Sequence, residues 1–97
     1  MNPIDTFNLD FRALSTFLAV LDEGSVSRAA VRLGVTQSAV SHTLERLRQA
    51  LGDPLFVKSG RGIVPTRYAL QAGPHIRQIL DDLQSLSSGP PFSPATA

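Results

Sequence analysis

The stretch SVSRAAVRLGVTQSAVSHTLERLRQAL, residues 25 to 51, decides the fold of this chain. Apolar residues recur at helical spacing up to Leu33, and they do so again from Val40 onward. Between these two parts stands Gly34, which can adopt the left-handed conformation that ends a helix. The hydroxyl of Thr36 can then cap the start of the next helix. The pattern predicts two helices joined by a very short turn, a helix–turn–helix.

The second of these helices is apolar on one side and polar on the other. Its apolar stripe consists of Val40, Leu44, Leu47 and Leu51. At about 100° per residue, short polar side chains of the first two turns lie opposite this stripe or on its flanks. These polar residues are Gln37, Ser38, Ser41 and His42. They can donate and accept hydrogen bonds and can reach base edges in the major groove of DNA. The alternative is an ordinary helix surface that faces solvent.

Charge is unevenly distributed along the chain, although the formal net charge is only +1. Residues 24 to 70 contain seven basic and two acidic residues, a net charge of +5. The remaining residues contain two basic and six acidic side chains, a net charge of −4. We therefore expect a basic surface that faces DNA, with the acidic residues turned away from it.

After Leu51 the periodicity changes from that of a helix to that of short strands. Residues 55–58 and 63–65 are predicted as the two strands of a hairpin with residues 59–62 at its tip. Gly60 and Gly62 permit positive φ angles at this tip, and Arg61 is held outward between them. The loop lacks the spacing of a nucleotide-binding P-loop, so that interpretation is disfavoured.

A single long helix is predicted from Thr66, its cap, to about Ser88. Its apolar residues are spaced as the inner seam of a coiled coil. They are Ala69, Ala72, Ile76, Ile79, Leu83 and Leu86. One helix cannot cover such a seam alone, so either a second copy of the chain or the first helix of the same chain must pack on it. Pro74 interrupts the seam and predicts a kink.

The run AAVRLGVTQSAVSHTLERLRQALGDPLFVKSGRGIVPT, residues 29 to 66, resembles the N-terminal DNA-binding domain of the LysR-type transcriptional regulators. The double alanine, the T-Q-S-A-V-S block, the D-P-L-F piece and the R-G-x-x-x-T piece follow one another at the family's spacing. The resemblance covers about residues 9 to 95. His42 departs from it, because the family usually has arginine there.

The resemblance implies a mostly α fold, a winged helix–turn–helix of three helices and a two-stranded wing, followed by a long linker helix that dimerises. It divides the chain into a flexible leader (1–8), a DNA-binding domain (9–65), a linker helix (66–88) and the start of a disordered hinge (89–97), with the effector domain absent. Gln37, Ser38, Ser41 and His42 would read bases, and Arg61 would enter the minor groove. The residues expected to contact DNA phosphates are Ser25, Ser27, Arg28, Arg32, Thr36, Lys58, Thr66 and Arg67.

These observations predict a homodimer that binds an inverted-repeat operator in double-stranded DNA and regulates transcription, with higher oligomers open to a full-length protein. A winged helix used only for protein interaction or dimerisation is the alternative.

The chain has no cysteine and two separate histidines, so we expect no metal, no cofactor and no enzymatic activity. No apolar run approaches the ~20 residues of a membrane span, and no signal-peptide pattern is present, so we expect a cytoplasmic protein. The resemblance implies a bacterial protein that joins the nucleoid when bound. A small-molecule effector would act only through the absent domain.

Overall fold

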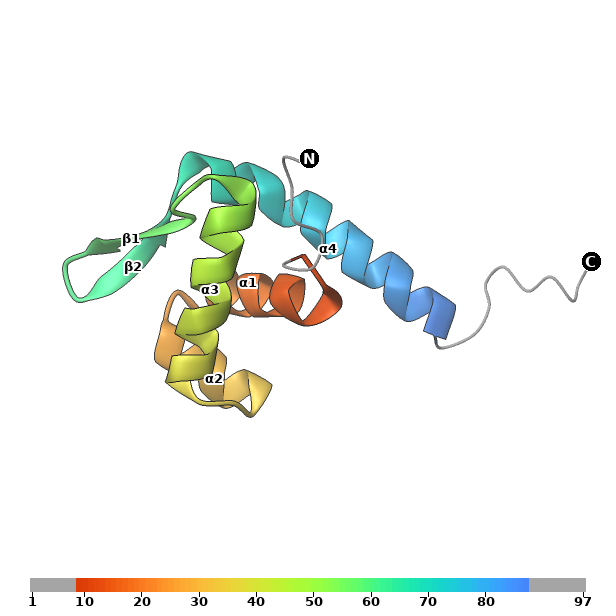
Figure 1. The fold of residues 1–97 in the computed structure, drawn as a ribbon, viewed down its shortest axis with the longest axis horizontal. Helices are drawn as coiled ribbons and strands as arrows, with labels where there is room; N and C mark the ends of the chain where they lie inside the picture. Colours follow the sequence, from red (N-terminus) through yellow and green to blue (C-terminus); the bar gives the residue numbers. More distant parts are fainter. Residues whose placement is uncertain (1–8, 88–97) are drawn as a thin grey trace, which may run out of the picture.

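The computed structural model describes residues 9–87 and contains four helices and one hairpin in this part of the chain (Figure 1). In chain order the elements are α1 (Phe11–Glu23), α2 (Val26–Leu33), α3 (Gln37–Leu51), β1 (Phe56–Ser59), β2 (Gly62–Pro65) and α4 (Arg67–Ser87). The winged helix–turn–helix with a long final helix is thus confirmed as the fold class. The leader and the hinge expected at residues 1–8 and 89–97 lie outside the described residues.

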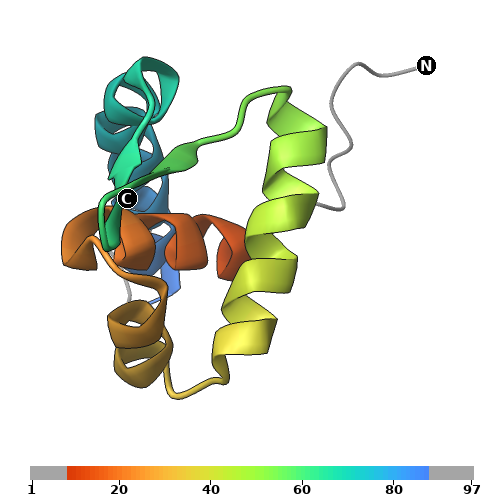
Figure 2. The same cartoon turned by 90° about the vertical axis from the view of Figure 1, so that its left-hand side faces the viewer.

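Helix α1 lies across the middle of the fold, and α2, α3 and α4 all pack against it (Figure 1, Figure 2). The largest fully buried side chains are Phe17, Val20, Val40, Leu47 and Leu55. The rings of Phe17 and Phe56 lie 5.6 Å apart between centroids, which joins the base of the wing to the core. Burial of these apolar surfaces is the main stabilising term for so small a domain.

The turn between α2 and α3 forms as the sequence predicts. Gly34 ends α2 with a φ of 71°, and the Oγ1 atom of Thr36 accepts the Ala39 N–H at 3.0 Å. The Val35 N–H donates to the Ala30 carbonyl at 3.0 Å, which satisfies one of the last carbonyl groups of α2. Ala29 and Ala30 are buried and small, so α2 can approach its neighbours closely. The start of α3 is thereby fixed relative to the core.

The wing is an antiparallel pair in which Phe56 pairs with Pro65 and Ser59 pairs with Gly62. Gly60 has a φ of 60°, as expected for the tip, but Gly62 has no positive φ because it already belongs to β2. That prediction was wrong. The first strand also begins one residue later than expected, because the buried Leu55 adopts a φ of 67° and belongs to the connection.

Helix α4 continues without interruption from Arg67 to Ser87, although Pro74 stands within it. The side of α4 that is buried within this chain consists of Ala69, Gly73, Ile76 and Leu80. A Cβ atom built on Gly73 would lie 2.7 Å from the Cδ2 atom of Leu21, so the backbone of α4 approaches α1 closely there. The kink expected at Pro74 stays a prediction.

The packing of α4 divides the predicted apolar seam. Ala69 and Ile76 are buried in the chain's own core, so they are not available to a second copy, which corrects their assignment to a dimer seam. The reason is that α4 packs against α1, with its closest printed approach at Gly73, and uses part of the seam within the chain. Three other seam residues are exposed, namely Ile79, Leu83 and Leu86, and Ala72 is half-buried. Within residues 9–87, none of the helices combines the length and the apolar character needed to cross a bilayer.

Candidate nucleic-acid interface

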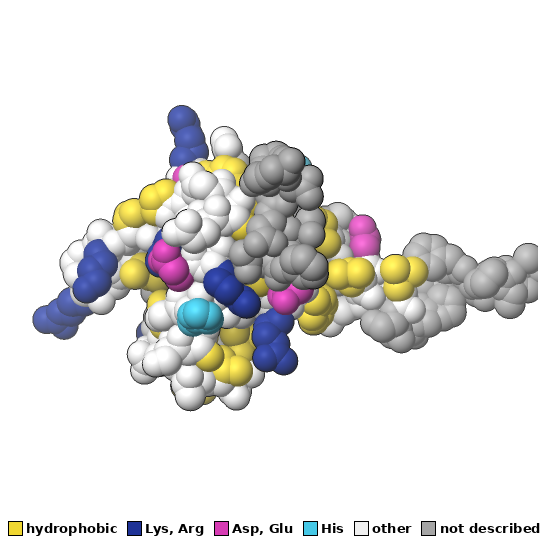
Figure 3. All heavy atoms as spheres, in the orientation of Figure 1, with side chains coloured by type: hydrophobic (Ala, Val, Ile, Leu, Met, Phe, Trp, Pro, Cys, Tyr) yellow, Lys and Arg dark blue, Asp and Glu magenta, His cyan; other side chains and the backbone are white. Residues whose placement is uncertain are grey.

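The polar residues predicted on the first two turns of α3 all face solvent. Gln37, Ser38, Ser41 and His42 are exposed, whereas the opposite face of the helix is held in the core by Val40 and Leu44. Figure 3 shows a histidine and basic side chains at the surface in the region that α3 occupies in Figure 1. The helix therefore presents a set of hydrogen-bonding side chains that no other described part of the chain covers.

Further along α3, charged side chains are paired with one another. The Glu45 carboxylate accepts hydrogen bonds from Gln49 Nε2 at 3.1 Å and from Arg48 Nη1 at 3.2 Å. The hydrogen bond from Gln49, and after it the one from Arg48, holds the pKa of Glu45 below its ordinary value. Arg48 also donates its Nε–H to the Pro54 carbonyl at 2.8 Å, which ties α3 to the base of the wing. An ionised carboxylate thus stays on the exposed side of α3.

Two serine side chains lie at the start of α2. Ser27 is exposed and Ser25 is half-buried. Ser25 caps the helix by accepting the Arg28 N–H at 3.1 Å, as the sequence predicts. The Oγ atoms of Ser25 and Ser27 lie 3.0 Å apart. Hydroxyl groups and free N–H groups at a helix start attract phosphate, so this end of α2 can hold an anion as well as a cap.

The acidic end of α1 lies beside the arginines of α2. Arg32 Nη1 lies 3.3 Å from Asp22 Oδ2 and 3.4 Å from Glu23 Oε2. Arg28 lies 3.9 Å from Glu23, and Arg77 of α4 lies 2.7 Å from Asp22. The expectation that acidic residues are turned away from the basic surface is therefore wrong for Asp22 and Glu23. They are the last two residues of α1, and the short connection through Gly24 brings α2 back against them.

These ion pairs are exposed, and exposed pairs contribute only about 0–1 kcal/mol each. Phosphate groups can compete for the same guanidinium groups, so the pairing does not remove Arg28 and Arg32 as phosphate contacts. It does lower the positive charge that the two arginines present to a distant duplex.

The hydroxyl group of Thr66 already makes two hydrogen bonds within the protein. Its Oγ1 atom donates to Asp53 Oδ2 at 2.7 Å and accepts the Ala69 N–H at 3.1 Å, so its single hydroxyl hydrogen is already used. The same carboxylate oxygen accepts the Leu55 N–H at 2.8 Å. This geometry favours a structural role for Thr66 over the predicted phosphate contact.

Asp53 is a residue whose role the sequence reasoning missed. Its carboxylate joins the turn before the wing to the start of α4, two segments that lie 13 residues apart. The signal that was present is local, because an aspartate side chain often accepts the backbone N–H two residues later. The contact with Thr66 is not local and has no sequence pattern.

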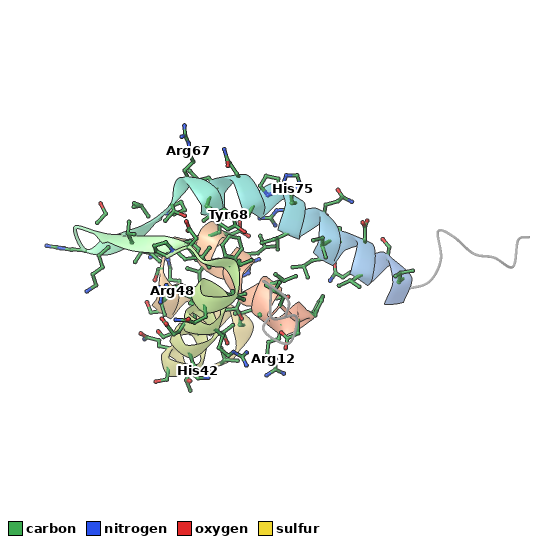
Figure 4. The ribbon with its side chains drawn as sticks, turned by 45° about the horizontal axis from the view of Figure 1, so that its top comes forward. Arg12, His42, Arg48, Arg67, Tyr68 and His75 are labelled. Atoms are coloured by element: carbon green, nitrogen blue, oxygen red, sulfur yellow. The ribbon has the colours of Figure 1, made fainter. Side chains whose placement is uncertain are left out.

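The remaining predicted contacts lie at the edges of this surface. Lys58 and Arg61 are exposed on the wing, Thr36 is exposed at the start of α3, and Arg67 is exposed at the start of α4. Figure 4 shows Arg67 pointing away from the fold on the side opposite to His42. Within residues 9–87, no three His, Cys, Asp or Glu side chains gather as they would around a metal ion.

A separate apolar groove of about 640 Å³ lies between α4 and the rest of the fold. Leu9 and Leu14 line it from the α1 side, Leu51 lines it from α3, and Tyr68, Ala72 and Ile79 are among the residues that line it from α4. Tyr68 and Ile79 are exposed, at 40% and 46% of their full accessibility. The groove lies apart from the polar face of α3.

Known proteins resemble this chain in sequence and in fold. The family described as "Bacterial regulatory helix-turn-helix protein, lysR family" matches residues 11–70. The transcriptional regulator LeuO of Escherichia coli is 42% identical over 89 residues, which are 92% of this chain and 28% of LeuO. The transcriptional activator NagR of a Ralstonia species is 40% identical over 92 residues, 94% of this chain and 31% of NagR.

A solved complex of the CbnR DNA-binding domain with DNA has a similar fold, with a TM-score of 0.76 at 32% identity. The similarity covers 81% of this chain and 91% of that domain. By contrast, the chain spans less than a third of the length of LeuO and NagR. The likeness is therefore to the DNA-binding part of these regulators.

Proposed function

Because this chain belongs to the LysR family of bacterial regulatory helix–turn–helix proteins and forms a DNA-binding domain of that family, we propose that it acts as a homodimer that binds an inverted-repeat operator and regulates transcription. The family, the fold and the DNA-binding role predicted from the sequence are confirmed. The residues that make the contacts, the dimer and the regulated process are the subject of the proposal.

The observation that carries the proposal is the open polar face at the start of α3. A helix of this width fits the major groove of B-form DNA, where each base pair presents its own pattern of donors and acceptors. The amide of Gln37 can bond to adenine with two hydrogen bonds, and the imidazole of His42 can donate to guanine N7 or O6. Ser38 and Ser41 can donate or accept beside them.

Phosphate contacts would set the position of α3 in the groove without selecting a sequence. We assign them to the side chains that are exposed or half-buried around α3, with Thr66 left out because its hydroxyl is engaged. They are Ser25, Ser27, Arg28, Arg32, Thr36 and Lys58. Arg67 is also left out, because its side chain points to the side of the fold opposite to His42. Arg61 at the exposed tip of the wing suits the minor groove, whose negative potential is strongest where A·T pairs narrow it.

A second copy of the chain would cover the apolar groove beside α4. The groove is open in one copy and is lined in part by the exposed Ile79, and Leu86 is exposed further along α4, so one chain alone leaves this apolar surface in water. Two copies related by a twofold axis would present two α3 helices to two half-sites of opposite direction. Relatives extend well beyond the matched region, and we propose that a small-molecule effector acts through such additional sequence.

Selection of bound duplexes from a random pool tests the proposal. We expect an enriched inverted repeat whose affinity falls steeply as the salt concentration rises, because phosphate contacts release condensed counterions. Enrichment of a single half-site would contradict the dimeric arrangement. Binding that shows neither sequence preference nor salt dependence would support the alternative, a winged helix used for protein interaction.

A further inference from the structure

A hollow of about 550 Å³ lies between the start of α1 and the side of α3. Arg12 and Ser15 line it from α1, and His42, Thr43 and Arg46 line it from α3. We propose that this hollow binds a backbone phosphate of the duplex, with Arg12 and Arg46 as the groups that hold it. The proposal rests on DNA binding through α3 and adds a phosphate site that the sequence did not indicate.

The electrostatic environment of the hollow differs from that of the other arginines. No carboxylate is among the residues that line it. Arg28, Arg32 and Arg77 each lie within 4 Å of Asp22 or Glu23, and Arg48 is paired with Glu45. Within residues 9–87 no such ion pair involves Arg12 or Arg46, so no described carboxylate lies within 4 Å of either guanidinium group.

The Arg46 side chain is also partly buried before any ligand arrives. Its Nε atom is buried and has no hydrogen-bond partner among the described residues. A guanidinium group that has lost part of its hydration gains more from a nearby anion than a freely hydrated one does. Guanidinium groups bind phosphate oxygens through paired N–H donors, and this favours a phosphate over a simple halide ion.

The hollow lies beside the polar face of α3, as a phosphate strand lies beside the major groove of a duplex. Along α3, His42 and Arg46 lie one turn apart on the edge that faces α1, whereas Arg48 lies on another edge and bonds to Pro54 at the base of the wing. The polar face of α3 is therefore bordered by basic groups on two sides, the hollow on one side and the wing on the other. Figure 4 shows Arg12 and His42 on the same side of the fold. The major groove is itself bordered by two phosphate strands, so the hollow would meet the strand that the wing does not reach.

The test measures how salt weakens the binding of a nonspecific duplex to the wild-type chain and to variants. Arg12→Gln and Arg46→Gln together remove both charges while they keep much of each side chain. Arg77→Gln is the matched control, because Arg77 lies on α4 outside the hollow. Fluorescence anisotropy between 50 and 300 mM salt gives the slope of log K against log salt concentration for each chain.

We expect the double variant to bind every duplex more weakly and to reduce the magnitude of this slope by about 0.9, the value for one lost phosphate contact. The control should keep the wild-type slope, and Arg46→Lys should keep most of it because it preserves the charge. An unchanged slope in the double variant, with normal binding by the wild type, would overturn this phosphate site and leave the proposed function standing. Absence of binding by the wild type would instead overturn the proposed function. If the double variant does not fold, Arg12→Gln alone decides the question, since Arg12 is exposed and its loss cannot open the core.

Discussion

Replacing Asp53 by alanine should destabilise the fold, because one carboxylate joins the turn before the wing to the start of α4. The carboxylate accepts the Leu55 N–H at 2.8 Å and the Thr66 hydroxyl at 2.7 Å. The first bond also supports a Leu55 backbone with a φ of 67°, a conformation that leucine rarely adopts. Without the carboxylate, the strained backbone and the hydroxyl both lose their partner.

The expected loss follows from these two bonds. A hydrogen bond to a charged group contributes about 1.5–3 kcal/mol, and the lower end applies here because Asp53 is only half-buried. Some of the lost bonding is recovered from water, so we expect the free energy of unfolding to fall by about 2–3 kcal/mol. For a domain of this size each 1 kcal/mol shifts the melting temperature by about 4–8 °C, which gives a decrease of about 8–24 °C.

Urea unfolding followed by circular dichroism measures this loss, with Asp82→Ala as the matched control. Asp82 is exposed on α4 and accepts one bond from Gln78 within the same helix, so its replacement should change stability by less than about 0.5 kcal/mol. Asp53→Asn should fall between the two, since its amide oxygen can still accept the Leu55 N–H. If Asp53→Ala is no less stable than the control, the carboxylate does not stabilise the wing and the reasoning is refuted.

Four further predictions concern DNA binding and assembly. Arg61→Ala should weaken binding most on operators with A·T-rich flanks in competition anisotropy; an equal loss on all flanks would reduce Arg61 to a phosphate contact. Gln37→Ala should cost about 1–3 kcal/mol of binding and relax the preference at one base position in a repeated selection, whereas an unchanged selected sequence would remove Gln37 from the reading residues. Glu45→Gln removes a negative charge from the exposed side of α3. The variant should bind every duplex more tightly, most strongly at low salt. An unchanged affinity would show that the carboxylate lies too far from the phosphates. Ile79→Glu should convert the dimer to monomer in sedimentation velocity, and Leu70→Glu, exposed on α4 outside the apolar groove, should not; the same result for both variants would contradict the role of the groove.

The helix–turn–helix could be predicted because its determinants are local. Gly34 and Thr36 act on neighbouring backbone groups, and the apolar period of α3 places Val40 in the core whatever the rest of the fold does. The same period places Gln37 and His42 on the exposed side. Exposure is all that a period can predict, so the bases that these residues would meet do not follow from it.

The packing of α4 could not be predicted, because a heptad spacing does not identify its partner. The same spacing serves a neighbouring helix or a second copy, and α4 uses part of it for α1 through Ile76 while Ile79 stays exposed. Gly73 was the missed signal. It permits the close approach of α4 to Leu21, which a larger residue would prevent.

The ion pairs around Asp22 illustrate a second limit. Charge counted along the chain assigned Asp22 and Arg32 to separate regions, but the turn at Gly24 brings their side chains to 3.3 Å from one another. The hollow at Arg12 and Arg46 has the same origin, since its two arginines are 34 positions apart in the sequence. Contacts of this kind depend on the tertiary fold and leave no spacing to recognise.

The central claim is that the start of α3 reads the base sequence of a duplex. The most direct measurement compares the affinities of the wild-type chain and the variant Gln37→Ala/Ser41→Ala/His42→Ala for a selected operator and for a scrambled duplex of the same composition. We expect the variant to lose the preference for the operator and to keep nearly the wild-type affinity for the scrambled duplex, because its phosphate contacts are intact. A variant that still prefers the operator as strongly as the wild type would show that sequence is read elsewhere.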